Sequence, residues 1–258
     1  MAATTPGIGR LYKGIEPAVP TLAVVNRRAP QQLQRILETV FEHQPVEVVE
    51  QWCTNASSDL VQLIEHETVI ASSPLEELTE TILLVNSDRY ITDGTVGKPA
   101  TFPAVLKRLD EIPFTVRGYP HSHREKLLFI AISRLIEQQA AEATTGMLRS
   151  SFQEVARLAT EPGTRVVYER LLDRPVDLKL FGHGAETPAP FEDVLVRGDR
   201  WAHRHTWIVS FRNESHAAAL FAAETQPKNW TGYWTFDPAR VDRINRWVDE
   251  HLQPSHCD

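Results

Sequence analysis

The longest hydrophobic pattern in the chain predicts a helix over about residues 123–143. Apolar side chains recur there at intervals of three and four residues, as they do along one face of a helix. The apolar members of the stripe are Leu127, Leu128, Ile130, Ala131, Ile132, Leu135 and Ile136, and Gln139 continues the same spacing. Ser122 and Glu125 have the spacing of a capping box at the helix start. Because the stripe is broad, we expect this helix to be covered on more than one side.

A second helix is predicted over about 148–160, after a break at residues 144–146. Leu148 and Phe152 lie four residues apart, so they would face inward from the same side of that helix. The two helices would then form a central pair.

The N-terminal half alternates between strand and helix patterns. The first 20 residues are rich in proline and glycine and predict an irregular arm, which Leu11, Tyr12 and Ile15 would dock. The elements predicted after it are strands at 21–27 and 46–52, a hairpin over 60–73 that bends near Glu67, helices at 31–41, 74–84 and 102–109, and an extended segment at 114–119.

The C-terminal half predicts a helix, a series of strands and a closing helix. These elements are a helix at 164–172, strands at 176–182, 192–198, 205–212, 217–225 and 232–238, and a helix at 239–252. Segments 31–84 and 164–252 therefore share an order of helix, strand, strand series and helix, which indicates a weak internal repeat.

The predicted fold is mixed α/β (α+β), with two sheet-bearing lobes joined by the central helix pair. Strands separated by helices are expected to be parallel, and the late strand series antiparallel, so the C-terminal sheet should be largely antiparallel. The expected organisation is an N-terminal arm (1–20), an N-terminal α/β lobe (21–115), a second domain (116–252) and a short tail (253–258).

Composition narrows the classes of function. The net charge of −7 argues against a nucleic-acid-binding or anionic-membrane-binding surface spread over the whole protein. The two cysteines, Cys53 and Cys257, are too few for a disulfide scaffold. No apolar run reaches the length of a membrane span, and the N-terminus has no hydrophobic leader, so we expect a cytoplasmic protein.

A series of short motifs in the second half of the chain resembles the DICT family of sensory domains, which occur beside diguanylate cyclases and two-component proteins. The motifs are SRLIE (133–137), Gly146, Leu148, SSFQ (150–153), TWIVSF with Trp207, AAETQ with Glu224, and WTGYWTFDP (230–238). Segments 83–92 and 112–120 are similar to the N-terminal half of stand-alone haloarchaeal members. The resemblance covers about residues 120–250.

The resemblance implies a sensory domain of an archaeal, halophilic type that takes part in signal transduction. The sequence contains no glycine-rich phosphate loop with a lysine, no nucleophile elbow and no cysteine pair at metal spacing. We therefore expect a non-enzymatic protein that binds a small molecule or a partner and relays the binding by a conformational change. Neither the signal nor a cofactor can be identified from the sequence.

Polar and aromatic residues within or beside these motifs are the candidate ligand-binding residues. They are Arg117, Tyr119, Arg134, Glu137, Arg149, Gln153, Trp207, Glu224, Trp230 and Trp234. A tryptophan wall with a polar tip suits a ligand pocket, but aromatic side chains of this size also dominate cores. Arg134 and Glu137 would equally form a structural ion pair. We expect Trp230 to be the most exposed tryptophan, because its surroundings are typical of a turn.

Two histidine pairs at alternate positions are the candidate metal ligands. His121 with His123 and His203 with His205 would each present two nitrogens from an extended segment. Both pairs flank predicted elements, and His123 falls in the first helical turn, so a structural role is the stronger interpretation.

Two alternatives to the sensor remain open on the sequence. The chain would otherwise act as an adaptor or homodimeric scaffold without a small ligand, through its central helices or the Trp230 region. A metal-dependent enzyme that uses the four histidines is the third hypothesis.

Overall fold

The computed structural model describes residues 7–15, 20–26, 32–52, 59–83, 101–118 and 126–253. The N-terminal elements are α1 (Ile8–Leu11), β1 (Thr21–Asn26), α2 (Gln32–Phe41), β2 (Glu47–Trp52), β3 (Leu60–Glu65), β4 (Thr68–Pro74), α3 (Leu75–Leu83), α5 (Ala104–Arg108) and β5 (Phe114–Arg117). The later elements are α6 (Lys126–Glu142), β6 (Met147–Glu154), α7 (Arg157–Thr160), α8 (Pro162–Leu172), β7 (Asp177–His183), β8 (Leu195–Arg197), α9 (Trp201–His205), β9 (Thr206–Arg212), β10 (Ala217–Gln226), β11 (Asn229–Thr235) and α10 (Pro238–His251). Within these ranges no helix has the length and apolar character needed to cross a membrane.

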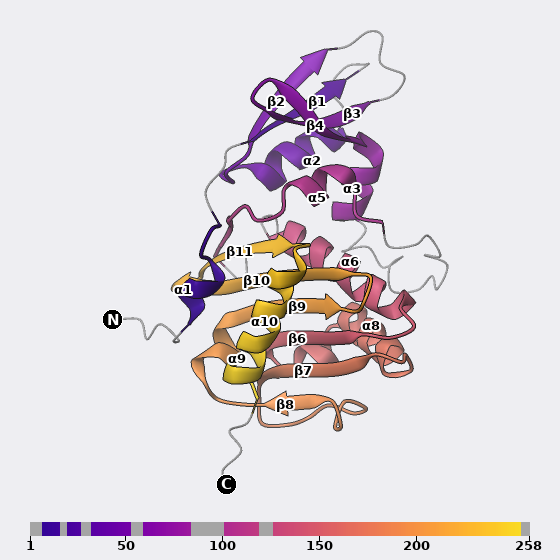
Figure 1. Cartoon of the computed structure of the whole chain (residues 1–258), viewed down its shortest axis with the longest axis vertical. Coiled ribbons are helices and arrows are strands. Elements are labelled where there is room, and N and C mark those ends of the chain that lie inside the picture. The colour runs from indigo at the N-terminus through magenta and orange to yellow at the C-terminus, as the bar shows by residue number, and fades with distance from the viewer. Residues whose placement is uncertain are drawn as a thin grey trace.

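The fold is mixed α/β, as predicted, with one four-stranded and one seven-stranded sheet. The small sheet has the order β2-β1-β3-β4, and the large sheet has the order β5-β11-β10-β9-β6-β7-β8. In the large sheet β5 through β6 pair antiparallel, whereas β6, β7 and β8 pair parallel. The expectation of a largely antiparallel C-terminal sheet is therefore confirmed. Helices α2, α3 and α5 lie between the two sheets (Figure 1).

One element differs in kind from its prediction: residues 147–154 form the central strand β6, not a helix. Leu148 and Ser150 face one side of the sheet while Arg149 and Ser151 face the other, and all four side chains are buried. A strand that is buried on both sides has no polar face, so the period of two was hidden by a chance four-residue apolar spacing. The prediction of a central helix pair is therefore wrong, because α6 is followed by a strand and not by a second helix.

The break before β6 depends on glycine. Gly146 has a φ of 149°, and a side chain there would bring its Cβ within 2.6 Å of the Phe211 ring. The chain thus turns from α6 directly into the sheet, where β6 pairs with β9 on one side and β7 on the other.

The large sheet is covered by helices on both faces. Helix α6 crosses one face, where its side chains join a core that extends into the small sheet and its helices. Helix α10 covers the other face, where its apolar residues pack on β9 and β10 (Figure 1). Strand β5, which contains the expected domain boundary at 115/116, pairs with β11 in the large sheet.

The two sheets repeat one strand order. In the small sheet β1 and β2 are parallel across α2, and β3 and β4 follow antiparallel. In the large sheet β6 and β7 are parallel across α8, and β9 and β10 follow antiparallel. The internal repeat suggested by the helix and strand order is thus present in the pairing of the strands.

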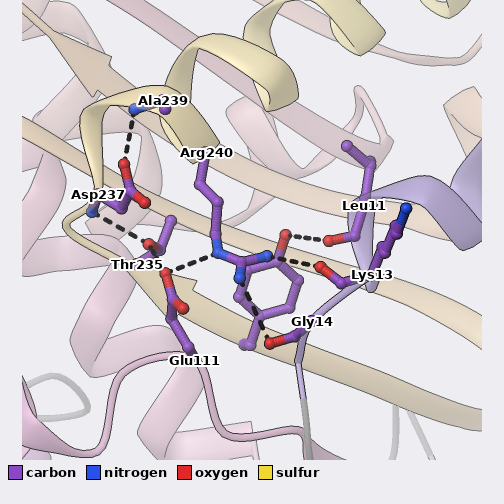
Figure 2. Close-up of polar contacts among 9 residues, drawn as sticks. Leu11, Lys13, Gly14, Glu111, Thr235, Asp237, Ala239 and Arg240 are labelled. Carbon is purple, nitrogen blue, oxygen red and sulfur yellow. Dashed lines mark hydrogen bonds and ion pairs between the residues drawn. The ribbon is translucent and has the colours of Figure 1, made fainter.

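The N-terminal arm contains the short helix α1 and docks onto β11 and α10 (Figure 2). Tyr233 donates a 2.8 Å hydrogen bond to the Leu11 carbonyl, and Arg240 donates to the carbonyls of Lys13 (3.0 Å) and Gly14 (3.4 Å). The Nε of Arg240 also binds Glu111 Oε1 at 2.7 Å. Arg240 therefore ties the arm and the segment before β5 to the last helix.

Replacing Arg240 by alanine should lower the free energy of unfolding by about 2 kcal/mol, because the Glu111 carboxylate and the two arm carbonyls lose their charged donor. Arg246→Ala, at an exposed site on the same helix, is the matched control and should change it by less than about 0.5 kcal/mol. Urea unfolding of both variants measures this difference, and trypsin cleavage after Lys13 should accelerate in the first variant only. Equal stability of the two variants would contradict the role assigned to Arg240.

A partly buried carboxyl group lies next to this junction. Burial, and to a lesser extent the neighbouring Glu111 carboxylate, raises the pKa of Asp110 to about 6. A raised pKa means that the folded protein binds this proton more tightly than the unfolded chain, so the stability from this group is lost as pH rises from about 4 to above 6.

The variant Asp110→Asn should therefore be more stable than the wild type at pH 7.5, by about 1–2 kcal/mol after allowance for solvent screening. At pH 3.5 most of this difference should be gone, because the carboxyl group is then protonated in the folded state and mostly protonated in the unfolded chain. Thermal unfolding across this pH range measures the difference in stability between the two proteins. A difference that does not change with pH would show that folding does not raise the pKa of Asp110.

Candidate functional site

A buried polar network lies between α6, α8 and β6. Arg134 binds Glu137 at 2.6 Å and the Thr164 hydroxyl at 2.9 Å. The hydroxyl of Tyr168 donates to Glu137 at 2.6 Å and is hydrogen-bonded to Ser150 Oγ at 2.8 Å. Glu137 is 3% exposed and Tyr168 is fully buried. One carboxylate thus holds two helices and the central strand in a single arrangement.

The protonation of this network follows from its surroundings. Burial, and then the charge of Glu137, raises the pKa of Tyr168 well above its ordinary value, so the phenol remains protonated and serves as a donor. Both carboxylate oxygens of Glu137 have a partner, one in Arg134 and one in Tyr168. A paired charge in a core contributes little net stability compared with apolar packing, whereas breaking the pair is costly. The network therefore specifies the position of α6 more than it stabilises the fold.

A second polar group lies on the same face of the large sheet and is partly exposed. His205 Nδ1 is in hydrogen-bond contact with Glu224, whose other oxygen accepts from the Lys228 amide at 2.6 Å. The rings of Trp201 and His205 stack at a centroid distance of 5.1 Å. The side chains of His205 and Glu224 are 33% and 19% exposed, so this end of the face is accessible to a ligand.

Trp207 connects this exposed group to α6. Its indole Nε1 donates to Ser133 at 3.1 Å, and its ring meets Phe129 edge-to-face at 6.0 Å. Ser133 precedes Arg134, so the same helix carries the contact with Trp207 and the ion pair with Glu137. The face under α6 therefore joins an accessible His–Glu pair to a buried charged network.

The predicted ligand-binding residues are divided between the two faces of the large sheet. Arg149 and Gln153 face the α10 side, away from Arg134, Glu137, Trp207 and Glu224. Gln153 donates to the Thr206 carbonyl at 2.7 Å, and Arg149 binds Asp177 at 2.5 Å. Because the hydrogen-bonded sheet lies between the two groups, they do not line one cavity.

Two of the predicted tryptophans are core residues. Trp234 is fully buried, stacks on Phe114 at 4.8 Å and donates to the Leu106 carbonyl at 2.8 Å. Trp230 was expected to be exposed, but it is 4% exposed. The turn lies just before Asn229, where β11 begins, so Trp230 is already a strand residue that faces the core. Arg117 is exposed at the end of β5, and Tyr119 lies outside the described residues.

The histidines do not gather in the described part of the chain. His203 is 2% exposed with its Nε2 3.1 Å from the Leu252 carbonyl, and burial lowers the pKa of its ring. His205 contacts Glu224 instead. Across the described ranges no three His, Cys, Asp or Glu residues form a group that could hold a metal. His121 and His123 lie outside those ranges.

Sequence analysis missed three members of the network: Ser150, Thr164 and Tyr168. Ser150 was assigned to a helix, which obscured the face on which it lies. Tyr168 lies in the predicted helix at 164–172, four residues after Thr164 and three before Leu171. All three are buried, so helical spacing could have indicated the burial of Tyr168. Its contact with Glu137, 31 positions earlier in the chain, could not be inferred from local spacing.

Comparison with known proteins does not assign the chain to a family. No family model matches the chain, and no curated protein matches it. Among solved structures it is similar to polyphosphate kinase from Porphyromonas gingivalis, with a TM-score of 0.35 and 11% identity over 93% of this chain. The match covers 47% of the kinase, so this chain spans about half of its length. A likeness at this level supports no argument about fold or function.

The close approach of α6 to the sheet depends on a small residue in β11. A Cβ at Gly232 would lie 2.4 Å from the Ala222 side chain and 2.8 Å from the Phe129 ring. We expect Gly232→Ala to push α6 off the sheet and lower the free energy of unfolding by about 2–3 kcal/mol. It should also weaken the near-ultraviolet circular dichroism of Trp207, which packs on Phe129.

Gly9→Ala is the matched control. Nothing lies within 4 Å of a Cβ at Gly9 in α1, so that variant should be unchanged or more stable by up to about 1 kcal/mol. If both glycine variants unfolded at the same denaturant concentration as the wild type, the close packing of α6 would be refuted.

Proposed function

We propose that this chain is a non-enzymatic, cytoplasmic signal-sensing protein that binds a small molecule or a partner and relays the binding through α6. The observation that carries the proposal is the charged network of Arg134, Glu137 and Tyr168 inside an otherwise apolar core. Such a network is expensive to bury and contributes little net stability, which suggests that it selects between arrangements of the helices.

The contacts along α6 support a route for the relay. Ligand contact at His205 and Glu224 would displace Trp207, which lies two residues after His205 in the chain. Trp207 holds Ser133 on α6 through its indole nitrogen. A shift or rotation of α6 would strain the contacts of Glu137 with Tyr168, and through Ser150 and Thr164 it would reach β6 and α8.

The state of the ionisable groups supports a sensing role over catalysis. The raised pKa of Tyr168 makes its phenol a poor base or nucleophile at neutral pH, and both oxygens of Glu137 are occupied. These groups are therefore suited to hold a geometry. The net charge of −7 favours a small-molecule or protein partner over a nucleic acid.

The first experiment is native mass spectrometry of the protein purified from its own host, followed by denaturation to release bound molecules. A small molecule near unit stoichiometry, or a defined second polypeptide, is the expected result. An empty protein with no partner in pull-downs would overturn the sensing proposal. An empty protein of dimeric mass would instead favour the homodimeric scaffold.

The relay is tested with the recovered ligand and the variant Tyr168→Phe, which keeps the ring but removes both hydrogen bonds to Glu137 and Ser150. In the wild type, ligand should change the hydrogen exchange of α8. In Tyr168→Phe, ligand should bind with an affinity within about threefold of the wild type, because the hydroxyl lies away from His205, yet the change in α8 should be lost.

Tyr12→Phe serves as the control, since it also removes a tyrosine hydrogen bond, here a partly buried one to the Thr231 carbonyl at 2.6 Å on the opposite face. It should keep the ligand response of α8. A full response in Tyr168→Phe would show that the network does not transmit the signal.

A further inference from the structure

Among the described residues, five buried polar side chains on the α10 side of the large sheet have atoms without a hydrogen-bond partner. Two are His203 (Nδ1) and Trp247 (Nε1), and the other three are Arg149 (Nε), Ser210 (Oγ) and Asn245 (Oδ1 and Nδ2). Arg149 is 4% exposed, Ser210 is fully buried and Asn245 is 5% exposed. Native structures leave few such groups unsatisfied, so a concentration of them needs a physical reason.

Two of the last three residues are cross-strand neighbours. In the register of β6 and β9, Arg149 lies directly opposite Ser210. Side chains of directly paired residues project from the same face, with Cβ atoms about 5 Å apart. Ala219 of β10 is the next residue in the same row and has only a methyl group. The row therefore combines one cation, one hydroxyl and one small side chain.

The direction of α10 places Asn245 over the same row. Arg212, at the end of β9, pairs with Asp242 at 3.4 Å, and Leu252 near the end of the helix contacts His203, before β9 begins. The helix therefore crosses the strands diagonally, advancing from the end of β9 toward its start (Figure 1). Asn245 is three residues after Asp242, so the two side chains lie on the same side of the helix, and Asn245 is displaced from Arg212 toward Ser210.

The available hydrogens define what these atoms can bind. Arg149 Nε–H, the Ser210 hydroxyl and the Asn245 amide nitrogen are donors, and the guanidinium carries a positive charge. The Asp177 carboxylate binds the NH2 edge of Arg149, and the Asp177 and Leu148 carbonyls accept from NH1, which leaves the Nε edge. A donor-rich, cationic group of this kind is complementary to an anion.

We propose that Arg149, Ser210 and Asn245 form a binding site for one small monovalent anion of halide size between α10 and the large sheet. Ile208, Ala219, Ile244 and Val248 belong to the apolar cluster packed between α10 and the sheet, which favours a small ion over a larger one. The nearby carboxylates are Asp177, paired with Arg149, and Asp242, paired with Arg212, so each already has its own cation. Lys179, the other neighbour of Arg149 in the row, adds a second positive charge. This site does not depend on the proposed sensing function, because the residues of the proposed relay lie on the opposite face of the sheet.

The test varies chloride at constant ionic strength, with gluconate as the replacement anion because it is too large to enter. The midpoint temperature of thermal unfolding of the wild-type chain should rise as chloride is added, by the amount that mass action gives for a ligand of the folded state. The effect should be specific to chloride, with no rise in gluconate. Ser210→Ala removes one donor with little change in volume and should weaken chloride binding about tenfold. Ser215→Ala, at an exposed turn, is the matched control and should titrate as the wild type does.

Bromide soaked into crystals provides a readout that does not depend on any variant. An anomalous peak in contact with Arg149 Nε, Ser210 Oγ and Asn245 would support the site. A water molecule in that position with no anomalous signal, or a chloride response that is identical in Ser210→Ala and the wild type, would overturn it.

Discussion

The structure depends on the close packing of one helix across the middle of a seven-stranded sheet. Helix α6 reaches the sheet because β10 and β11 present Ala222 and Gly232 at the crossing point, which leaves room for the Phe129 ring. Further along, the helix carries a carboxylate into the core, and that carboxylate is tolerated because Arg134 and Tyr168 satisfy both of its oxygens. Packing density and complete pairing of Glu137 therefore constrain the same element.

On the opposite face of the sheet, apolar and aromatic packing holds the covering helix in place. Helix α10 packs on β9 and β10 through apolar residues, and the N-terminal arm closes the aromatic cluster of Tyr12, Phe221, Tyr233 and Trp247. Arg240 then secures the arm by hydrogen bonds to its carbonyls (Figure 2). On this face the polar atoms of Arg149, Ser210 and Asn245 are left unpaired, whereas under α6 the charged network is closed. The contrast separates a group suited to holding a geometry from a group suited to receiving an ion.

The two sheets share one strand order. Each sheet begins with a parallel pair connected across a helix and continues with antiparallel neighbours. Strand β5 comes from the segment after the first sheet and pairs with β11, so it adds an edge to the second sheet. The core consequently runs through both sheets, and Trp234, which stacks on Phe114 of β5, lies at their junction.

Much of the fold was determined by local sequence. The 3.6-residue period of α6 and the strand series 206–235 were read correctly because each has one dominant apolar face or a clear turn between strands. Strand β6 was misread because it is buried on both faces, which leaves no alternation, and only its pairing with β7 and β9 identifies it as a strand. Trp230 was expected in a turn, yet the position of the turn depends on the pairing of β10 with β11.

The candidate sites show the same division. The sequence alone identified Arg134, Glu137, Trp207 and Glu224 as residues of interest, since they are polar or aromatic groups within recognisable motifs. It could not place Arg149 on the other face from Glu137, because the face is set by the parity of a strand that had not been recognised. Nor could it join Ser150 and Tyr168 to Glu137, or Asn245 to Ser210, since these partners are far apart in the chain. Tertiary packing alone decides which buried polar groups find a partner and which are left for a ligand.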